Sequence, residues 1–175
     1  MNLHRLLDRI LEHYTLSFSG IHGIWHWGRV MENGLRLAEE NGANQDVIRL
    51  FALFHDSQRF SDGYDTDHGE RGAALATEFR DRGLIELDDQ NFALLHYACC
   101  WHEKGLTQGD LTVRVCWDAD RLDLGRVGII PNPDRLCTSE GRSKEMRQWA
   151  THRAVAGIIP EWIEDWLDLR RKKRM

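Results

Sequence analysis

Apolar residues recur at the spacing of an α-helix along almost the whole chain. The first stripe consists of Leu3, Leu6, Leu7, Ile10 and Leu11. Steps of three and four residues place such side chains on one helix face. Comparable stripes begin near His22, Asp46, Asp67, Asp88, Asp110 and Arg142 and after Pro160. Helices with one apolar face bury it against other helices. The sequence therefore predicts an all-α fold in a single compact domain.

Turn and capping residues divide this pattern into separate helices. Side chains that can cap a helix N-terminus stand at Asp46, Asp67, Asp88 and Asp110. Asp67 and Glu70 also have the spacing of a capping box. We expect the second helix to run from about His22 to Glu40, and residues 129–139, which hold two of the three prolines, to be irregular.

Length and composition exclude several classes of protein. A chain of 175 residues fits one domain, which we expect to span 1–175. Apolar residues make up 42% and charged residues 29% of it, and the mean hydropathy is -0.52, as in soluble globular proteins. No segment approaches the roughly 20 apolar residues of a membrane-spanning helix. Charges interrupt the N-terminal leucines, so no signal peptide is expected.

Charge and cysteine content restrict the partners and the compartment. The net charge of -5 argues against binding to a nucleic-acid polymer. The four cysteines lack the paired spacing of a metal site, which favours a reducing, cytoplasmic environment. The apolar edge that carries Trp162 and Trp166 fits either a core position or the surface of a homodimer.

Histidine and aspartate at the end of an apolar helix are the strongest chemical signal. The chain has nine histidines, and six of them lie between His22 and His102. His55 and Asp56 follow directly on a stripe that we expect to be buried, where ionisable groups need a partner. Imidazole and carboxylate together suit a divalent metal. An isolated pair of this kind is more often a capped helix end.

Two further segments supply groups of the same chemistry. His22 and His26 are four residues apart and would share a helix face. In DADRLD, Asp120 follows Cys116 by four residues, so its carboxylate faces the same way as the buried stripe. An inward carboxylate needs a counter-charge. A metal would provide it, and so would a lattice formed with Arg114, Arg121 and Arg126.

The order of these residues along the chain resembles the HD-domain superfamily of metal-dependent phosphohydrolases. The resemblance lies in HGIWHWGRV, LFHDSQRF, WHEKG and DADRLDLGRVG. It covers about 22–128, and we expect helices within 142–175 to pack on this core. It implies an all-helical HD-type domain in which one divalent cation (Mn, Fe, Co, Ni, Zn or Mg) is bound by His26, His55, Asp56 and Asp120. The motif selects His26 over His22, and Asp120 over Asp118 and Asp123.

The resemblance also concerns a second metal. Superfamily members with two metals supply histidines from positions like those of His68 and His102. Trp101 stands where such members have another histidine, which counts against a second ion. His68 and His102 are therefore candidates either for a second metal or for phosphate contacts, and Lys104 is a weaker candidate.

The implied activity is hydrolysis of a phosphate ester of a small molecule, with a nucleotide as the expected substrate. A nucleotidase, a pyrophosphohydrolase and a phosphodiesterase all fit. Asp56 would hold both the metal and the attacking water, and Arg59 and Arg29 would neutralise phosphate, unless they form surface salt bridges. The general acid stays open among Asp62, Asp65, Asp67, Glu70 and Glu103.

Two other functions fit the same residues. The first is a di-iron oxygenase, which would need both metals. The second is a non-enzymatic ligand-sensing module that keeps a metal for stability. Several of the seven tryptophans stand beside the motif residues, either as core or as a surface for ligand stacking.

Overall fold

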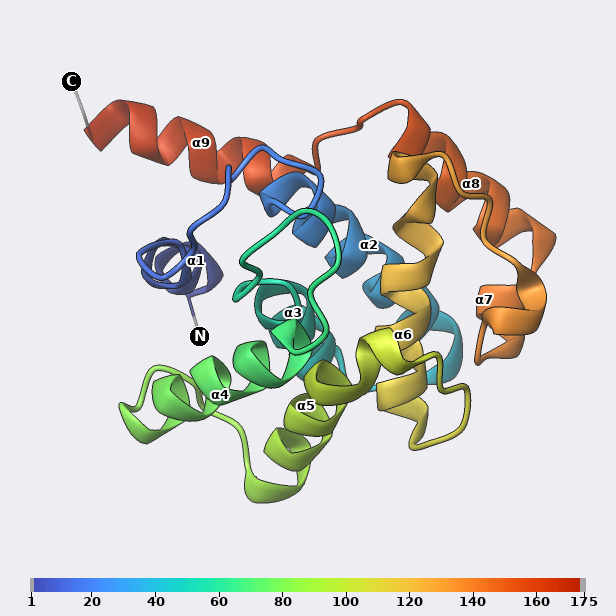
Figure 1. Ribbon diagram of the computed structural model, residues 1–175, viewed down its shortest axis with the longest axis horizontal. Coiled ribbons are helices and arrows are strands. Elements are labelled where there is room, and N and C mark those ends of the chain that lie inside the picture. Colours follow the sequence, from blue (N-terminus) through green and yellow to red (C-terminus); the bar gives the residue numbers. More distant parts are fainter. Residues whose placement is uncertain (1, 174–175) are drawn as a thin grey trace.

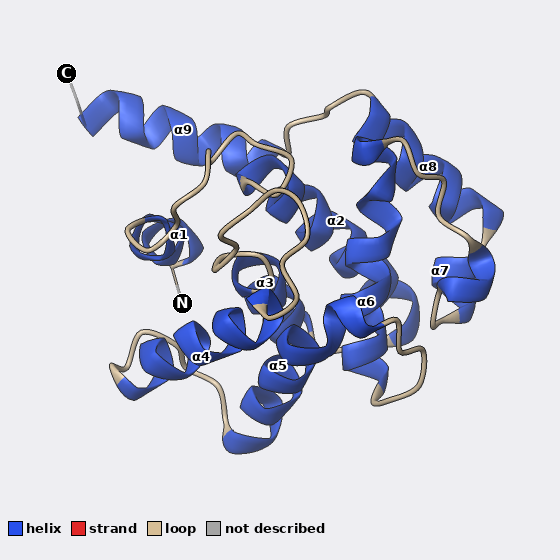
Figure 2. Ribbon diagram, in the orientation of Figure 1, coloured by secondary structure: helices blue, strands red, loops and turns tan. Residues whose placement is uncertain are grey.

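The computed structural model describes residues 2–173; Met1, Arg174 and Met175 lie outside the described residues. The α-helices are α1 (Leu3–Leu11), α2 (Ile24–Asn41), α3 (Gln45–Phe54), α4 (His68–Asp81), α5 (Asp89–Trp101), α6 (Leu111–Leu122), α7 (Ser139–Arg142), α8 (Lys144–Val155) and α9 (Glu161–Lys173). Short 3-10 helices are η1 (His102–Lys104), η2 (Asp123–Val127) and η3 (Pro133–Arg135). Figure 1 shows their arrangement, and Figure 2 shows helices and loops without a strand in the described part of the chain. The all-α prediction is confirmed.

The helix ends agree with the sequence at some positions and differ at others. Asp88 and Asp110 cap α5 and α6, because their side chains accept backbone N–H groups in the first turn. The cap of α3 is Asn44 rather than Asp46, since the Asn44 side chain accepts from two N–H groups ahead of it. Asp67 precedes α4 without a side-chain cap bond, so the expected capping box does not form.

The second helix begins at Ile24, two residues later than expected. The chain turns through Gly23, whose added Cβ would meet the carbonyl oxygen of Phe18 at 2.1 Å. Because His22 lies in that turn, the two histidines do not share a helix as their spacing predicted, although their rings still meet edge to face with centroids 6.4 Å apart.

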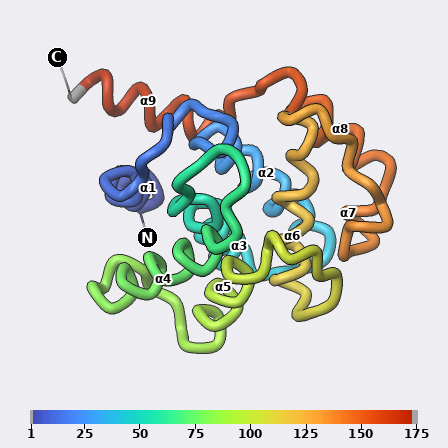
Figure 3. Tube along the Cα trace, in the orientation of Figure 1, coloured from blue at the N-terminus to red at the C-terminus, as the bar shows by residue number. Residues whose placement is uncertain are grey.

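Helix α3 is the central element of the fold. From Leu50 to Phe54 all its side chains are fully buried, and the helices α2, α5 and α6 pack around it. Figure 3 shows α3 in the interior of the trace, with the loop to α4 leading away from its end. The N-terminal half of α3 keeps a polar side at Gln45, Asp46 and Arg49, whereas its C-terminal half is surrounded by other helices and is apolar all round.

Close approach of α4 to its neighbours depends on two glycines. A Cβ on Gly72 would lie 2.3 Å from the carbonyl oxygen of Phe54, at the C-terminal end of α3. A Cβ on Gly69 would lie 2.4 Å from the carbonyl oxygen of Cys99 on α5 and 3.0 Å from the His102 ring. Only glycine allows backbones to approach this closely. The start of α4 is thereby held against the ends of α3 and α5.

The C-terminal helix α9 packs within the same chain. Trp166 is buried, and its indole N–H donates to the Asp8 carboxylate on α1 at 3.0 Å. Trp162 stacks on the His4 ring. The apolar edge considered for a homodimer is therefore occupied by α1, and a homodimer stays a prediction without that support. Within residues 2–173, no helix is both long and apolar enough to cross a bilayer.

Candidate metal centre

Five segments bring together, beside the C-terminal end of α3, six side chains that could bind a metal. These side chains are His26 on α2, His55 and Asp56 after α3, His68 at the start of α4, His102 after α5, and Asp120 on α6. Each comes from a helix end or from the last turns of a helix, where α3 is nearest. The sequence predicted all six as candidates.

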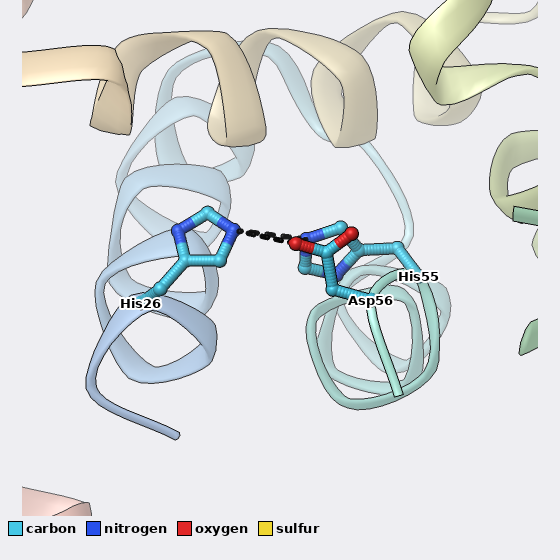
Figure 4. A group of neighbouring side chains, drawn as sticks. All are labelled: His26, His55 and Asp56. Carbon is cyan, nitrogen blue, oxygen red and sulfur yellow. Dashed lines mark hydrogen bonds and ion pairs between the residues drawn. The ribbon is translucent and has the colours of Figure 1, made fainter. Parts of the chain in front are cut away.

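Four of these side chains, which we call the first group, point their ligand atoms at one another. The Nε2 atoms of His26 and His55 are 3.1 Å apart. From His26 Nε2, Asp56 Oδ2 lies at 3.5 Å and Asp120 Oδ1 at 3.4 Å. From His55 Nε2 the same oxygens lie at 3.7 and 3.8 Å. Figure 4 shows His26 facing His55 and Asp56 across the gap between two helices. Ligands about 2.1 Å from one metal ion lie about 3.0–3.5 Å apart, so these separations suit a shared cation.

Hydrogen-bond partners fix which nitrogen of each ring is free. His26 Nδ1 lies 2.7 Å from Asp123 Oδ2, and His55 Nδ1 lies 3.1 Å from the Phe51 carbonyl oxygen. Both partners only accept, so each Nδ1 carries the hydrogen. When both rings are neutral, each turns a bare Nε2 lone pair toward the other ring and toward two carboxylate oxygens. Such a cluster of acceptors needs a cation between them, and the residues present fit a divalent metal.

The electrostatics of the first group agree with a missing positive charge. Burial lowers the pKa of His26, but hydrogen bonds to Asp120, Asp123 and Asp56 outweigh burial and raise its pKa to about 9. Burial lowers the pKa of His55 to about 3, so this ring is neutral. Without a metal, the group therefore captures one proton on His26. Within the described residues, Asp120 forms no ion pair with a lysine or arginine, which rules out the arginine lattice.

Asp56 connects the first group to a second group formed with His68 and His102. Asp56 Oδ1 lies 3.2 Å from His68 Nε2 and 3.7 Å from His102 Nε2, and the two Nε2 atoms are 2.9 Å apart. His102 Nδ1 donates to the Cys99 carbonyl at 2.7 Å, and His68 Nδ1 faces the Asp65 carbonyl. Both free Nε2 atoms therefore point at Asp56. These three side chains would also fit a cation.

Arg59 lies at the second group and is buried. Its Nη1 is 3.4 Å from Asp56 Oδ1 and 3.1 Å from His68 Nε2. Arg59 therefore lies beside the central aspartate, and its contact with phosphate stays a prediction.

Arg29 lies on the Nδ1 side of His26, away from the ligand atoms of the first group. Its guanidinium binds Asp123 through two bonds, Nε to Oδ1 at 2.7 Å and Nη2 to Oδ2 at 3.1 Å, and its Nη1 donates to the Ile158 carbonyl. These bonds use the guanidinium to hold Asp123, so its expected contact with phosphate is not supported. Asp123 in turn orients His26.

Sequence reasoning set Asp123 aside and did not foresee this supporting role. The available signal was the spacing of three between Asp120 and Asp123, which places both carboxylates on one side of α6 and the turn after it. Asp118, the third acid, points elsewhere: its oxygens accept from the backbone N–H groups of Cys137 and Thr138.

Among the five acids considered as the general acid, Glu103 is the one whose carboxylate contacts a histidine of either group. Its Oε2 lies 3.0 Å from His68 Nδ1. Lys104 is exposed and bonds to Glu103 and to the Thr66 carbonyl, which places it at the edge of the second group. Asp62 pairs with His22 instead, and Asp65 pairs with Arg71.

Of the six side chains, that of Asp120 is the most exposed. Its side chain is 19% exposed, whereas those of His26 and His55 are fully buried. A cavity of about 780 Å³ lies between α1 and α9, and none of the six side chains lines it. That cavity is therefore separate from the centre.

Comparisons with known proteins identify the fold. No protein-family model matches this chain, and no curated protein matches it. A solved structure does: the crystal structure of a predicted HD superfamily hydrolase from an uncultured Thermotogales bacterium. The two chains are 24% identical, the match covers 96% of this chain and 98% of the other, and the TM-score is 0.64. The HD-type helical fold expected from the sequence is confirmed.

Proposed function

We propose that this protein is a metal-dependent phosphohydrolase that acts on a phosphate ester of a small molecule, with a nucleotide as the expected substrate. The observation that carries the proposal is the first group, where two histidine nitrogens and two carboxylate oxygens converge without a lysine or arginine between them. The shared fold with a chain described as a hydrolase supports the same reaction class.

In the proposed reaction the first group, Asp56 and Arg59 would each have a different role. A divalent ion bound by the first group would lower the pKa of a coordinated water and neutralise charge on phosphate. Asp56 turns Oδ2 to the first group and Oδ1 to the second, so one carboxylate can hold the metal and also accept a proton from the attacking water. Arg59, fixed beside Oδ1, can bind a phosphate oxygen on the same side.

An exposed aromatic ring supports a nucleotide as the substrate. Trp101 directly precedes His102 and is 41% exposed, whereas Trp27 and Trp117 are fully buried in the core. A base stacked on an aromatic side chain gains about 1–3 kcal/mol. In a Trp101→Ala variant we expect KM to rise about 10-fold or more for a nucleotide and to stay unchanged for p-nitrophenyl phosphate. Equal effects on both substrates would argue against base stacking.

The decisive experiment measures metal content and phosphate release on the same preparations. The purified chain is assayed with Mn²⁺ and with Mg²⁺ against a panel of nucleotides and other phosphoesters. We expect His55→Ala and Asp56→Ala to abolish metal binding and turnover, and His13→Ala, whose ring packs on Phe79 away from the centre, to change neither. Full activity and full metal content in Asp56→Ala would refute the assignment.

The same measurements separate the alternative functions. Two irons per chain with a visible charge-transfer band would favour a di-iron oxygenase. Bound metal without phosphate release across the panel would favour a ligand-sensing module.

A further inference from the structure

The guanidinium of Arg59 is held rigidly at the second group. Its Nε donates to the Ser61 carbonyl at 3.1 Å, and its Nη2 donates to the Gly63 carbonyl at 2.8 Å. Both carbonyls belong to the loop that follows α3. Because they fix two of the three nitrogens, the third, Nη1, points at Asp56 and His68.

The contacts of Nη1 define where the positive charge lies. It is 3.1 Å from Nε2 and 3.4 Å from Nδ1 of His68, and 3.4 Å from Asp56 Oδ1. In the plane of the ring, a partner at these distances from both nitrogens would overlap Cε1, so Nη1 lies over the face of the ring. The charge is therefore adjacent to two of the three side chains that would bind a second metal. An arginine cannot remove this charge by losing a proton.

A count of the charges at the centre favours a single metal ion. The two outer carboxylates are each paired with basic side chains, Asp123 with Arg29 and Arg126, and Glu103 with Lys104. The two inner carboxylates are Asp56 and Asp120. Asp56 has Arg59 beside it, and Asp120 contacts only histidines among the basic side chains of the described residues. One dication in the first group, together with Arg59, already exceeds the negative charge of Asp56 and Asp120. A second would add two more charges next to a guanidinium, where burial leaves charges weakly screened.

We propose that Arg59 takes the place of a second metal ion: the centre holds one dication in the first group, and the guanidinium supplies the second positive charge beside Asp56. This inference rests on the metal centre of the proposed function. It follows that removal of the Arg59 charge should let Asp56, His68 and His102 bind a second ion.

The test is the number of Mn²⁺ ions bound per chain, measured by equilibrium dialysis on the full chain without substrate. We expect one ion in the wild-type protein, two in Arg59→Gln and in Arg59→Met, and one again in Arg59→Gln combined with His102→Ala. Electron paramagnetic resonance gives a second readout, because two neighbouring Mn²⁺ ions couple magnetically and a single ion does not. Arg71→Gln is the matched control: Arg71 binds the same loop through Asp65 and Gln58 and lies outside both groups.

Each outcome is informative about a different claim. Two ions in the wild-type protein, or one ion in Arg59→Gln and Arg59→Met that melt cooperatively, would overturn the role of Arg59 and leave the metal centre intact. A second ion in Arg71→Gln would also overturn it, because the effect would then follow from loosening the loop. No bound ion in the wild-type protein would refute the metal centre itself and the proposed function with it.

Discussion

Replacement of Asp123 by asparagine tests whether the hydrogen bond behind His26 sets metal affinity. Asp123 is fully buried and accepts three bonds, one from His26 and two from Arg29. Asparagine has one oxygen in place of two, so its NH₂ group must face one of these donors. A neutral amide oxygen is also a weaker acceptor than a carboxylate, so the bond that keeps the His26 hydrogen on Nδ1 is weakened, and Arg29 loses its counter-charge.

The expected magnitudes follow from these contacts. Loss of the carboxylate behind a metal-binding histidine weakens metal affinity about 10–100-fold, which corresponds to about 1.4–2.7 kcal/mol. Breaking the buried ion pair with Arg29 lowers the free energy of unfolding by about 3–5 kcal/mol. Both quantities are measurable, the first by calorimetric titration with Mn²⁺ and the second by urea unfolding of the metal-free protein.

Asp118→Asn is the matched control on the same helix. Asp118 is as buried as Asp123, but its carboxylate binds the backbone N–H groups of Cys137 and Thr138 and the Thr138 hydroxyl. We expect a loss of about 1–3 kcal/mol in unfolding free energy and no change in metal affinity. Wild-type affinity in Asp123→Asn, or equal weakening in both variants, would refute the reasoning.

Two further predictions concern the pH dependence of metal binding and the packing of α4. Because the pKa of His26 is about 9 in the metal-free protein, Mn²⁺ should displace about one proton at pH 7, and its affinity should rise with pH up to about 9. Calorimetry in buffers of different ionisation enthalpy measures this release, and binding without proton release would contradict the charge state of His26. Gly69→Ala should lower the free energy of unfolding by about 1–3 kcal/mol, since the new Cβ would collide with the Cys99 carbonyl and crowd His102. Gly63→Ala, in a loop with space for a Cβ, is the control in thermal unfolding, and equal losses would show that the close approach of α4 does not matter.

Local patterns were sufficient to predict the helices and most candidate residues. The apolar stripe of α1 and the caps Asp88 and Asp110 depend on neighbouring residues in the chain, so they can be read from sequence. The same holds for His55 and Asp56, which stand out as ionisable groups at the end of a buried stripe. Each of these signals spans fewer than a dozen residues.

The failures occur where a local signal has two structural outcomes. Asn44 and Asp46 can both cap a helix, and the choice between them depends on the turn that leads into α3. His22 and His26 have helical spacing, but the backbone of the preceding loop packs against Gly23, so the helix begins only at Ile24 and His22 lies before it. Neither difference alters the residues that form the centre.

The sequence by itself determined that the chain is helical and which residue types could bind a metal. Only the tertiary structure decided how these residues are used, because His26 and Asp123 are 97 positions apart and meet only when α2 packs beside the end of α6. The tertiary structure also decided the roles of the two arginines. Both follow a histidine of the motif by one helical turn, yet Arg29 binds Asp123 whereas Arg59 contacts Asp56. Helical spacing fixes which face a side chain occupies, whereas its partner is fixed by the helix that packs on that face.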